Sequence, residues 1–208
     1  MPGETDQVAA RTRARGGDIP EDAALLLVDV QNDFCPGGAL AVPEGDRVIP
    51  VLNRMIDRFE SRGLPIYASR DWHPPDTTHF QEQGGPWPPH CVAGTRGADL
   101  HPDLRVPRDT IVISKGQDRA DDGYSAFEGT TAEGRMLADD LRARGVGTIY
   151  VGGLATDYCV RASALDARRH AFDVALLTDG TAGIDPAGSE RAVEEMRRAG
   201  AVVTTSRA

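Results

Sequence analysis

The sequence has few cysteines, few aromatic residues and no long apolar run. Three cysteines among 208 residues are too few, and odd in number, for a disulfide framework. No apolar stretch approaches the roughly 18 residues that a transmembrane helix needs. The N-terminal segment also lacks the apolar centre of a signal peptide. We therefore expect a cytoplasmic protein without a membrane segment.

The sequence also has few positive charges: 23 basic residues and 32 acidic residues give a net charge of −9. Nucleic acids and anionic membranes are bound through basic surfaces. The charge balance therefore argues against both classes of partner, and solubility alone accounts for the acidity. The length and the 40% hydrophobic content predict one globular domain with an ordinary core.

The N-terminal segment differs in composition from the rest of the chain. Residues 1–21 are polar, with arginines at 11, 13 and 15 among small residues, and we interpret them as a disordered leader. The domain then comprises residues 22–208, in which apolar runs alternate with helical patterns. The expected strands are 24–30, 64–69, 110–114, 148–154, 172–178 and 201–205, and the expected helices are 46–62, 135–144, 156–171 and 188–199.

This alternation predicts an α/β fold. We expect a single-domain, Rossmann-like, three-layer arrangement in which helices cover both faces of a six-stranded, mainly parallel sheet. Residues 70–109 are the exception, because they are rich in Pro, Gly and His and show no period. A stretch of that length in a compact domain is either a wrongly assigned element or a functional loop. Its polar content favours the functional loop.

Titratable side chains stand at the expected ends of four strands. Asp29, Asp71 and Lys115 end the first three strands, and Cys159 follows the fourth at the start of a helix. In open parallel sheets, ligands bind beyond the carboxyl ends of the strands. Each residue alone could be a solvated side chain or a helix cap. Their common position predicts a shared site.

Cys159 has the setting of a reactive thiol. The positive end of the helix dipole and a nearby ammonium group both favour the thiolate, and Lys115 could supply that ammonium. Asp29 could take the thiol proton and later return it as a general acid. A lone cysteine is otherwise more often a small core residue, which is our interpretation of Cys35 and Cys91.

The loop after Asp71 contains a second cluster. Three of the five histidines fall within eighteen positions: His73, His79 and His90. Asp71 and His73 project in the same direction from an extended segment, because side chains alternate. A carboxylate with imidazoles suits zinc, iron or manganese, although scattered histidines on a surface loop would give the same pattern. We interpret the other two histidines as a loop residue and a helix-surface residue: His101 and His170.

Six motifs carry a resemblance to a known family. They are residues 28–38 (VDVQNDFCPGG), 71–73 (DWH), 87–95 (WPPHCVAGT), 114–116 (SKG), 124–127 (YSAF) and 153–160 (GLATDYCV). Together they resemble the nicotinamidases, also called pyrazinamidases, a branch of the isochorismatase-like cysteine hydrolases. The resemblance spans residues 24–206.

The resemblance implies both an activity and the residues that perform it. The activity would be hydrolysis of nicotinamide to nicotinate and ammonia in NAD salvage, with pyrazinamide as a further substrate. Asp29, Lys115 and Cys159 would form the catalytic triad. The backbone N–H groups of Ala155 and Cys159 would form an oxyanion hole next to a cis Leu154–Ala155 bond. The aromatic walls of the pocket would be Phe34, Trp87 and Tyr124, and the metal ligands Asp71, His73 and His90, with His79 at a fourth position.

Residues 117–123 depart from the family pattern at the rim of the pocket. Two alternatives stay open. One is another hydrolase of the superfamily that acts on a different small amide or carbamoyl compound, generally without the metal loop. The other is a binding protein without activity, against which the intact triad argues. The sequence thus predicts a small aryl carboxamide as partner and one divalent metal ion, is compatible with a homo-oligomer, and leaves open the metal and the number of subunits.

Overall fold

The structure, a computed structural model, describes residues 19–207. Most of the expected leader therefore lies outside the described residues. Ile19 is buried and belongs to the apolar core, so the packed domain includes at least this residue of the segment that we assigned to the leader.

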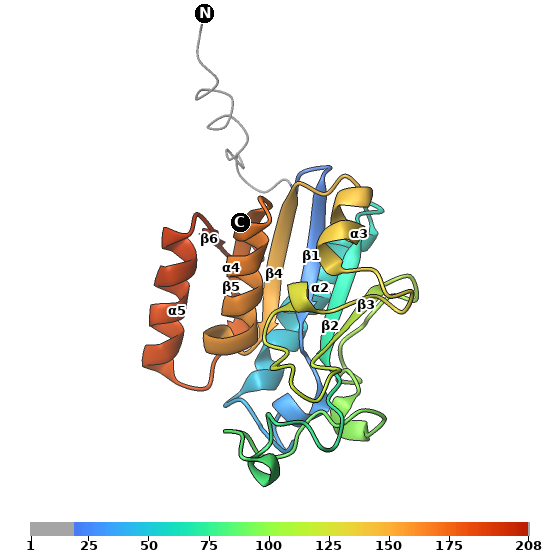
Figure 1. Cartoon of the computed structure of the whole chain (residues 1–208). Helices are drawn as coiled ribbons and strands as arrows, with labels where there is room; N and C mark the ends of the chain where they lie inside the picture. Colours follow the sequence, from blue (N-terminus) through green and yellow to red (C-terminus); the bar gives the residue numbers. More distant parts are fainter. Residues whose placement is uncertain (1–18, 208) are drawn as a thin grey trace, which may run out of the picture.

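Six parallel strands form one sheet (Figure 1). They are β1 (Ala23–Val28), β2 (Ile66–Asp71), β3 (Ile111–Lys115), β4 (Thr148–Leu154), β5 (Asp173–Ala182) and β6 (Val202–Thr204). The spatial order is β3-β2-β1-β4-β5-β6, and all five neighbouring pairs are parallel. The predicted α/β fold is confirmed. Because the order reverses between β1 and β4, a crevice is expected at the carboxyl ends of these two strands.

Helices cover both faces of the sheet, which gives the predicted three layers. Helix α2 (Ile49–Glu60) packs on one face, and α3 (Leu137–Ala143), α4 (Arg161–Arg169) and α5 (Pro186–Arg198) lie on the other (Figure 1). Strand β1 is buried along its whole length and faces both layers. Its Leu25 packs in the core beneath α2, and its Leu26 packs in the core beneath the other three helices. A strand buried on both faces explains the continuous apolar run in the sequence.

Three predicted elements differ from the structure by more than two residues at one end. The helix expected over 156–171 starts as a π-helical turn, Thr156–Val160, before α4. The helix expected over 46–62 starts as a 3₁₀ turn, Gly45–Val48, before α2. Strand β5 continues beyond the expected residue 178, because a register shift lets its last residues pair with Gly153 and Leu154.

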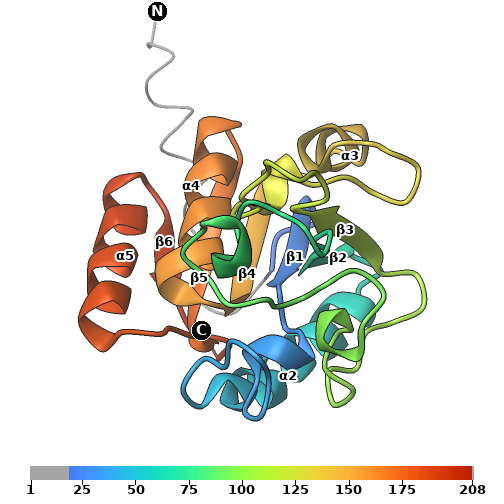
Figure 2. The same cartoon turned by 60° about the horizontal axis from the view of Figure 1, so that its bottom comes forward.

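The loops after β1 and β2 gather below the carboxyl ends of the strands (Figure 1), as the turned view also shows (Figure 2). The long loop after β2 is folded on itself. A parallel bridge joins His73 to Val92, another joins Phe80 to Trp87, and an antiparallel bridge ties Gln31 to Leu100. The stretch without a period is therefore an ordered loop over the edge of the sheet where ligands bind in this class of fold.

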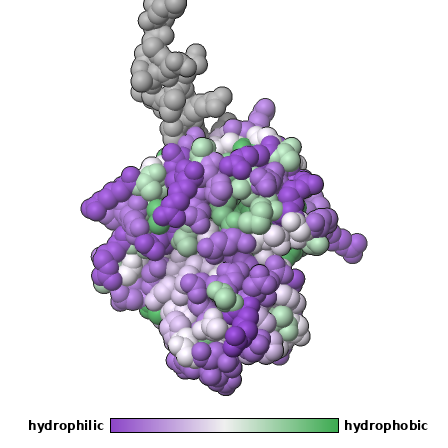
Figure 3. Space-filling view, in the orientation of Figure 1, coloured by the Kyte–Doolittle hydropathy of each residue, from purple (hydrophilic) through white to green (hydrophobic). Residues whose placement is uncertain are grey.

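One face of the surface is largely hydrophilic, with small separate apolar areas (Figure 3). Among the described residues, only two large hydrophobic side chains are exposed, Met136 and Val202. No helix in the described part of the chain combines the length and the apolar character that crossing a membrane requires. Assembly into an oligomer stays a prediction.

Candidate active site

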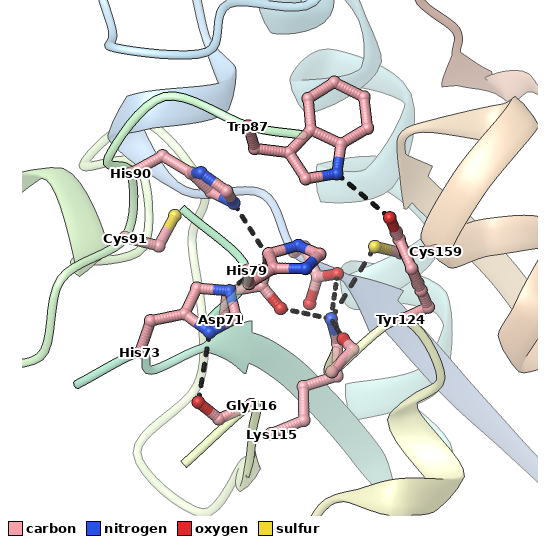
Figure 4. A network of polar contacts seen from close by, with 12 residues as sticks. Asp71, His73, His79, Trp87, His90, Cys91, Lys115, Gly116, Tyr124 and Cys159 are labelled. Carbon is pink, nitrogen blue, oxygen red and sulfur yellow. Dashed lines mark hydrogen bonds and ion pairs between the residues drawn. The ribbon is translucent and has the colours of Figure 1, made fainter. Parts of the chain in front are cut away.

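The three expected catalytic residues meet around the side chain of Lys115. Its Nζ lies 2.8 Å from Asp29 Oδ2 and 3.6 Å from Cys159 Sγ, and it also forms an ion pair with Asp71. Figure 4 shows the ammonium group of Lys115 between the Asp71 carboxylate and the Cys159 sulfur. Asp29, Lys115 and Cys159 are all buried. Segments far apart in the sequence therefore meet at the carboxyl edge of the sheet.

Each of these side chains is fixed by the element that carries it. Asp29 directly follows β1 in a left-handed backbone conformation, with φ 48°, and its Oδ1 accepts a hydrogen bond of 2.7 Å from Ser69 Oγ. Lys115 is the last residue of β3, and Cys159 lies in the π-helical turn after β4. Such turns are rare and often occur at functional sites.

The environment of Cys159 favours the protonated thiol at rest. Burial raises the pKa of Cys159 well above its usual value, and Lys115 opposes this by less. Lys115 thus favours the thiolate, as expected from the sequence, but burial has the larger and opposite effect. A base is therefore needed to activate the sulfur.

Asp29 has the properties of that base. Burial raises the pKa of Asp29 to about 6, against the opposing effect of Lys115. Burial alone would lower the pKa of Lys115, but Asp29 and Asp71 raise it well above its usual value. At neutral pH the site therefore combines a carboxylate that can accept a proton with a permanently charged ammonium group.

A cluster of imidazoles adjoins the triad. His73, His79 and His90 each offer a nitrogen, and these three atoms lie within 4.8 Å of one another. Asp71 Oδ2 lies 3.7 Å from His73 Nε2 and 4.0 Å from His90 Nε2. The side chains of Asp71, His73, His79 and His90 are all buried, and they converge in Figure 4.

The hydrogen bonds of two histidines determine what the cluster can hold. His73 Nδ1 lies 3.0 Å from Gly116 O, and His90 Nδ1 lies 2.8 Å from Pro88 O. A carbonyl oxygen only accepts, so both Nδ1 atoms carry a proton, and in a neutral ring the Nε2 atom then presents a lone pair. His73 Nε2 is buried and has no hydrogen-bond partner.

These lone pairs point toward a carboxylate, an arrangement that is repulsive without a cation. Burial also lowers the pKa of His90, to about 4, and the pKa of His79, so both rings are neutral at pH 7. Neutral imidazoles with one carboxylate are the ligands of zinc, iron and manganese. The residues therefore fit a divalent metal ion.

A second group, formed by Asp29, Asp71 and Cys159, also has ligand atoms within 4.8 Å of one another. The ammonium group of Lys115 contacts all three side chains. A positive charge is thus already in place there, and we do not interpret this group as a metal site.

A cavity with about 390 Å³ of empty space, open solvent included, lies between the triad and the imidazole cluster. The three expected aromatic residues line the cavity: Phe34, Trp87 and Tyr124. Ala155 and Cys159 line it as well. Trp87 Nε1 donates a hydrogen bond of 2.9 Å to the Tyr124 hydroxyl, which joins two loops across the cavity. The Leu154–Ala155 peptide bond is cis, as the resemblance implied.

A model of the isochorismatase domain matches residues 23–208. The chain belongs to the isochorismatase family. This isochorismatase-family hydrolase is 44% identical over 200 residues to the nicotinamidase of Escherichia coli (strain K12), a match that covers 88% of this chain and 94% of that protein. It is 42% identical over 182 residues to the nicotinamidase/pyrazinamidase of Mycobacterium tuberculosis, covering 85% and 95%.

A solved structure has the same fold. The pyrazinamidase of Pyrococcus horikoshii in complex with zinc matches with a TM-score of 0.83 and 49% identity, covering 89% of this chain and 99% of that one. The family resemblance predicted from the motifs is therefore confirmed.

Several residues of the isochorismatase-family site escaped the sequence analysis. Tyr158 lines the cavity and is a neighbour of Cys159 in the recognised motif. Three apolar residues complete the wall without any local signal, because they come from distant loops: Leu40, Val42 and Ile184.

The remaining cysteines and histidines lie where we expected them. Cys35 and Cys91 are buried core residues. His101 lies in a loop, where its ring accepts a hydrogen bond from Asp103 N. His170 follows α4, and its ring stacks on Phe127.

Proposed function

We propose that this chain is a nicotinamidase, which hydrolyses nicotinamide to nicotinate and ammonia through a thioester on Cys159. The observation that carries the proposal is the position of Lys115 Nζ, 2.8 Å from a carboxylate and 3.6 Å from a thiol, beside a cluster of imidazoles in one cavity. The nicotinamidases at 44% and 42% identity support the choice of substrate.

The walls of the cavity suit a flat aromatic ring. Phe34, Trp87 and Tyr124 offer aromatic surface to the ring of an aryl carboxamide. Cys159 Sγ lies at the same cavity, so that the amide carbon can be held next to the sulfur. Pyrazinamide has the same size and shape, and we expect it to be a second substrate.

Asp29 moves the protons of the reaction. It takes the thiol proton as the Cys159 sulfur attacks the amide carbon, and it then gives that proton to the amide nitrogen. The C–N bond breaks, ammonia leaves and a thioester forms. Asp29 next takes a proton from water, whose oxygen attacks the thioester. The C–S bond breaks, nicotinate leaves and the thiol regains its proton.

Two backbone N–H groups would hold the negative charge that develops on the amide oxygen. We assign this role to Ala155 and Cys159, which both line the cavity. Losing one such donor typically costs about 3–4 kcal/mol of transition-state stabilisation. Lys115 stabilises the negative charges of Asp29 and of the attacking sulfur, because its pKa keeps it protonated.

Asp71, His73 and His90, with His79 as a fourth, would hold one divalent metal ion. When bound, the ion would supply a Lewis-acidic site that orients the pyridine ring of the substrate. Zinc, iron and manganese all suit these ligands. We place the reaction in the cytoplasm, within NAD salvage.

The test is ammonia release from nicotinamide, pyrazinamide and a set of small carbamoyl compounds, with and without a chelator. We expect release from the two aryl carboxamides, loss of that activity with the chelator, and recovery when zinc is added. Release from carbamoyl compounds alone, in protein free of metal, would instead support another hydrolase of the family. Tight nicotinamide binding without turnover would support a binding protein.

A further inference from the structure

The side chain of Gln31 takes the place of a missing strand residue beside Asp71. The pairing of β1 with β2 ends at Leu27 and Ala68, and the chain then turns away at Asp29. Gln31 Oε1 accepts a hydrogen bond of 2.8 Å from Asp71 N, and Gln31 Nε2 donates one of 2.8 Å to Asp71 O. Both backbone groups of Asp71 are therefore held by one side chain.

The same amide also holds the loop that carries the histidines. Gln31 Nε2 donates a further hydrogen bond of 2.8 Å to Ala98 O, and the Gln31 backbone forms a bridge with Leu100. Gln31 has no exposed surface. A carboxamide offers one acceptor and two donors, so both sides of the group are in use. Neither a carboxylate nor an apolar side chain of the same length could replace all of these bonds.

Gln31 thus connects three parts of the site. It stands two residues after Asp29, and its own N–H donates to Asp29 O at 2.9 Å. Its side chain fixes the backbone of Asp71, whose Oδ2 faces His73 Nε2 at 3.7 Å and His90 Nε2 at 4.0 Å. A rotation of the Asp71 backbone would carry this oxygen away from both nitrogen atoms.

We propose that Gln31 is a positioning residue, which sets the metal affinity of the site by fixing the backbone of Asp71. The proposal rests on the proposed metal role of Asp71. Partners that orient a metal ligand typically change metal affinity about 10- to 100-fold when they are replaced. We therefore expect the loss of the Gln31 amide to weaken metal binding by that factor.

The experiment measures zinc affinity of the metal-free full-length protein by competition with a chelator. Gln31→Met removes every side-chain hydrogen bond at nearly constant length, and Gln31→Glu keeps the acceptor and loses the two donors. Thermal unfolding and circular dichroism report whether each variant is folded, so that Gln31→Glu, which keeps the bond from Asp71 N, serves if Gln31→Met does not fold. We expect zinc affinity to fall about 10- to 100-fold in each folded variant.

Asn53 offers a matched control. Its side-chain amide likewise accepts one hydrogen bond from the backbone of another loop and donates one to it. Asn53 accepts from Arg105 N at 2.8 Å and donates to Asp103 O at 2.9 Å. Asn53→Leu should therefore lower the unfolding temperature and leave zinc affinity unchanged.

The outcomes separate this proposal from the proposed function. Unchanged zinc affinity in the folded Gln31 variants, with a loss of stability like that of Asn53→Leu, would overturn the role of Gln31 alone. Wild-type protein that binds no zinc would overturn the metal role of Asp71, and the role of Gln31 with it.

Discussion

At the scale of single residues, the surroundings of Asp29, Lys115 and Cys159 give these three side chains different protonation states. Burial raises the pKa values of both Cys159 and Asp29, whereas two carboxylates raise the pKa of Lys115. The result at neutral pH is a neutral thiol, an ionised carboxylate and a charged ammonium group. This combination supports the proposed role of Asp29 as the base, because the other two groups already hold their protons.

Replacing Asp29 tests that assignment. Asp29→Asn keeps the size of the side chain and removes the proton acceptor, so we expect kcat to fall about 10²- to 10⁴-fold. Ser69→Ala, which removes only the hydrogen bond to Asp29 Oδ1, should cost less. Ammonia release at matched zinc content measures both effects, and wild-type turnover by Asp29→Asn would contradict the role of base.

The pH dependence of activity follows from the same carboxyl group. With a pKa of about 6, Asp29 is ionised above that pH and protonated below it, so kcat/KM should fall as the pH drops through about 6. The Ser69 hydrogen bond lowers the pKa of Asp29, so Ser69→Ala should move this fall to higher pH. Initial rates, with zinc content assayed at each pH, check both expectations. An identical profile for the two proteins would argue against Asp29 as the titrating group.

At the scale of elements, apolar runs predicted the six strands, and their polar ends predicted that Asp29, Lys115 and Cys159 meet. The ends of the elements were less predictable. Residues 156–160 have the composition of an ordinary helix, and only their packing after β4 reveals the π-helical turn that carries Cys159. The extension of β5 depends on a register shift against β4, which no local pattern encodes.

A substitution at Gly116, directly after β3, tests how closely the loops enclose the proposed metal ligand His73. A Cβ atom on Gly116 would lie 2.4 Å from His73 Cε1, and its φ is +64°. Gly116→Ala should therefore displace the imidazole and weaken zinc binding. Gly134→Ala is the matched control, because Gly134 has φ +77° and open space around its Cβ position.

Both variants should lose about 1–2 kcal/mol of stability through left-handed strain, and only Gly116→Ala should lose zinc affinity. Chelator competition and thermal unfolding separate the two effects. Equal zinc affinity in both variants would show that His73 has room to move.

Helix α3 is joined to the sheet through a buried carboxylate. Asp140 accepts hydrogen bonds from Tyr67 at 2.7 Å, Arg135 at 2.9 Å and Arg144 at 2.7 Å. Burial opposes its ionisation, but the hydrogen bonds from Arg144 and Tyr67 hold the pKa of Asp140 below its usual value. A lowered pKa in the folded state means that the stabilisation is present above the usual pKa of 3.8 and is lost as the pH falls below it.

Asp140→Asn should lower the free energy of unfolding by about 1–3 kcal/mol at neutral pH, with a smaller difference in acid. Asp139→Asn, on the exposed side of the same helix, should change it little. Urea unfolding at two pH values measures both variants. A loss that persists unchanged in acid would mean that the charge of Asp140 is not what stabilises α3.

At the scale of the whole molecule, one topological rule connects the fold to the site. Because all strands are parallel, their carboxyl ends share one edge, and the residues that follow them meet there. The rule predicted the meeting of Asp29, Lys115 and Cys159 from sequence alone. It could not predict the wall of the cavity, because Leu40, Val42 and Ile184 reach it from loops of no regular pattern. The hydrogen bonds of Gln31 could not be predicted from the sequence either. They join Gln31 to Asp71, which is 40 positions away, and to Ala98, which is 67 positions away.

The most direct test of the proposed thioester mechanism measures ammonia release from nicotinamide. It compares the wild-type protein with Cys159→Ala and Cys35→Ala, all with the same zinc content. Cys35 is a matched control, because it is also buried but belongs to the apolar core. We predict rapid release by the wild type and Cys35→Ala, and none above the uncatalysed rate by Cys159→Ala. Release by Cys159→Ala at the wild-type rate would contradict the thioester mechanism.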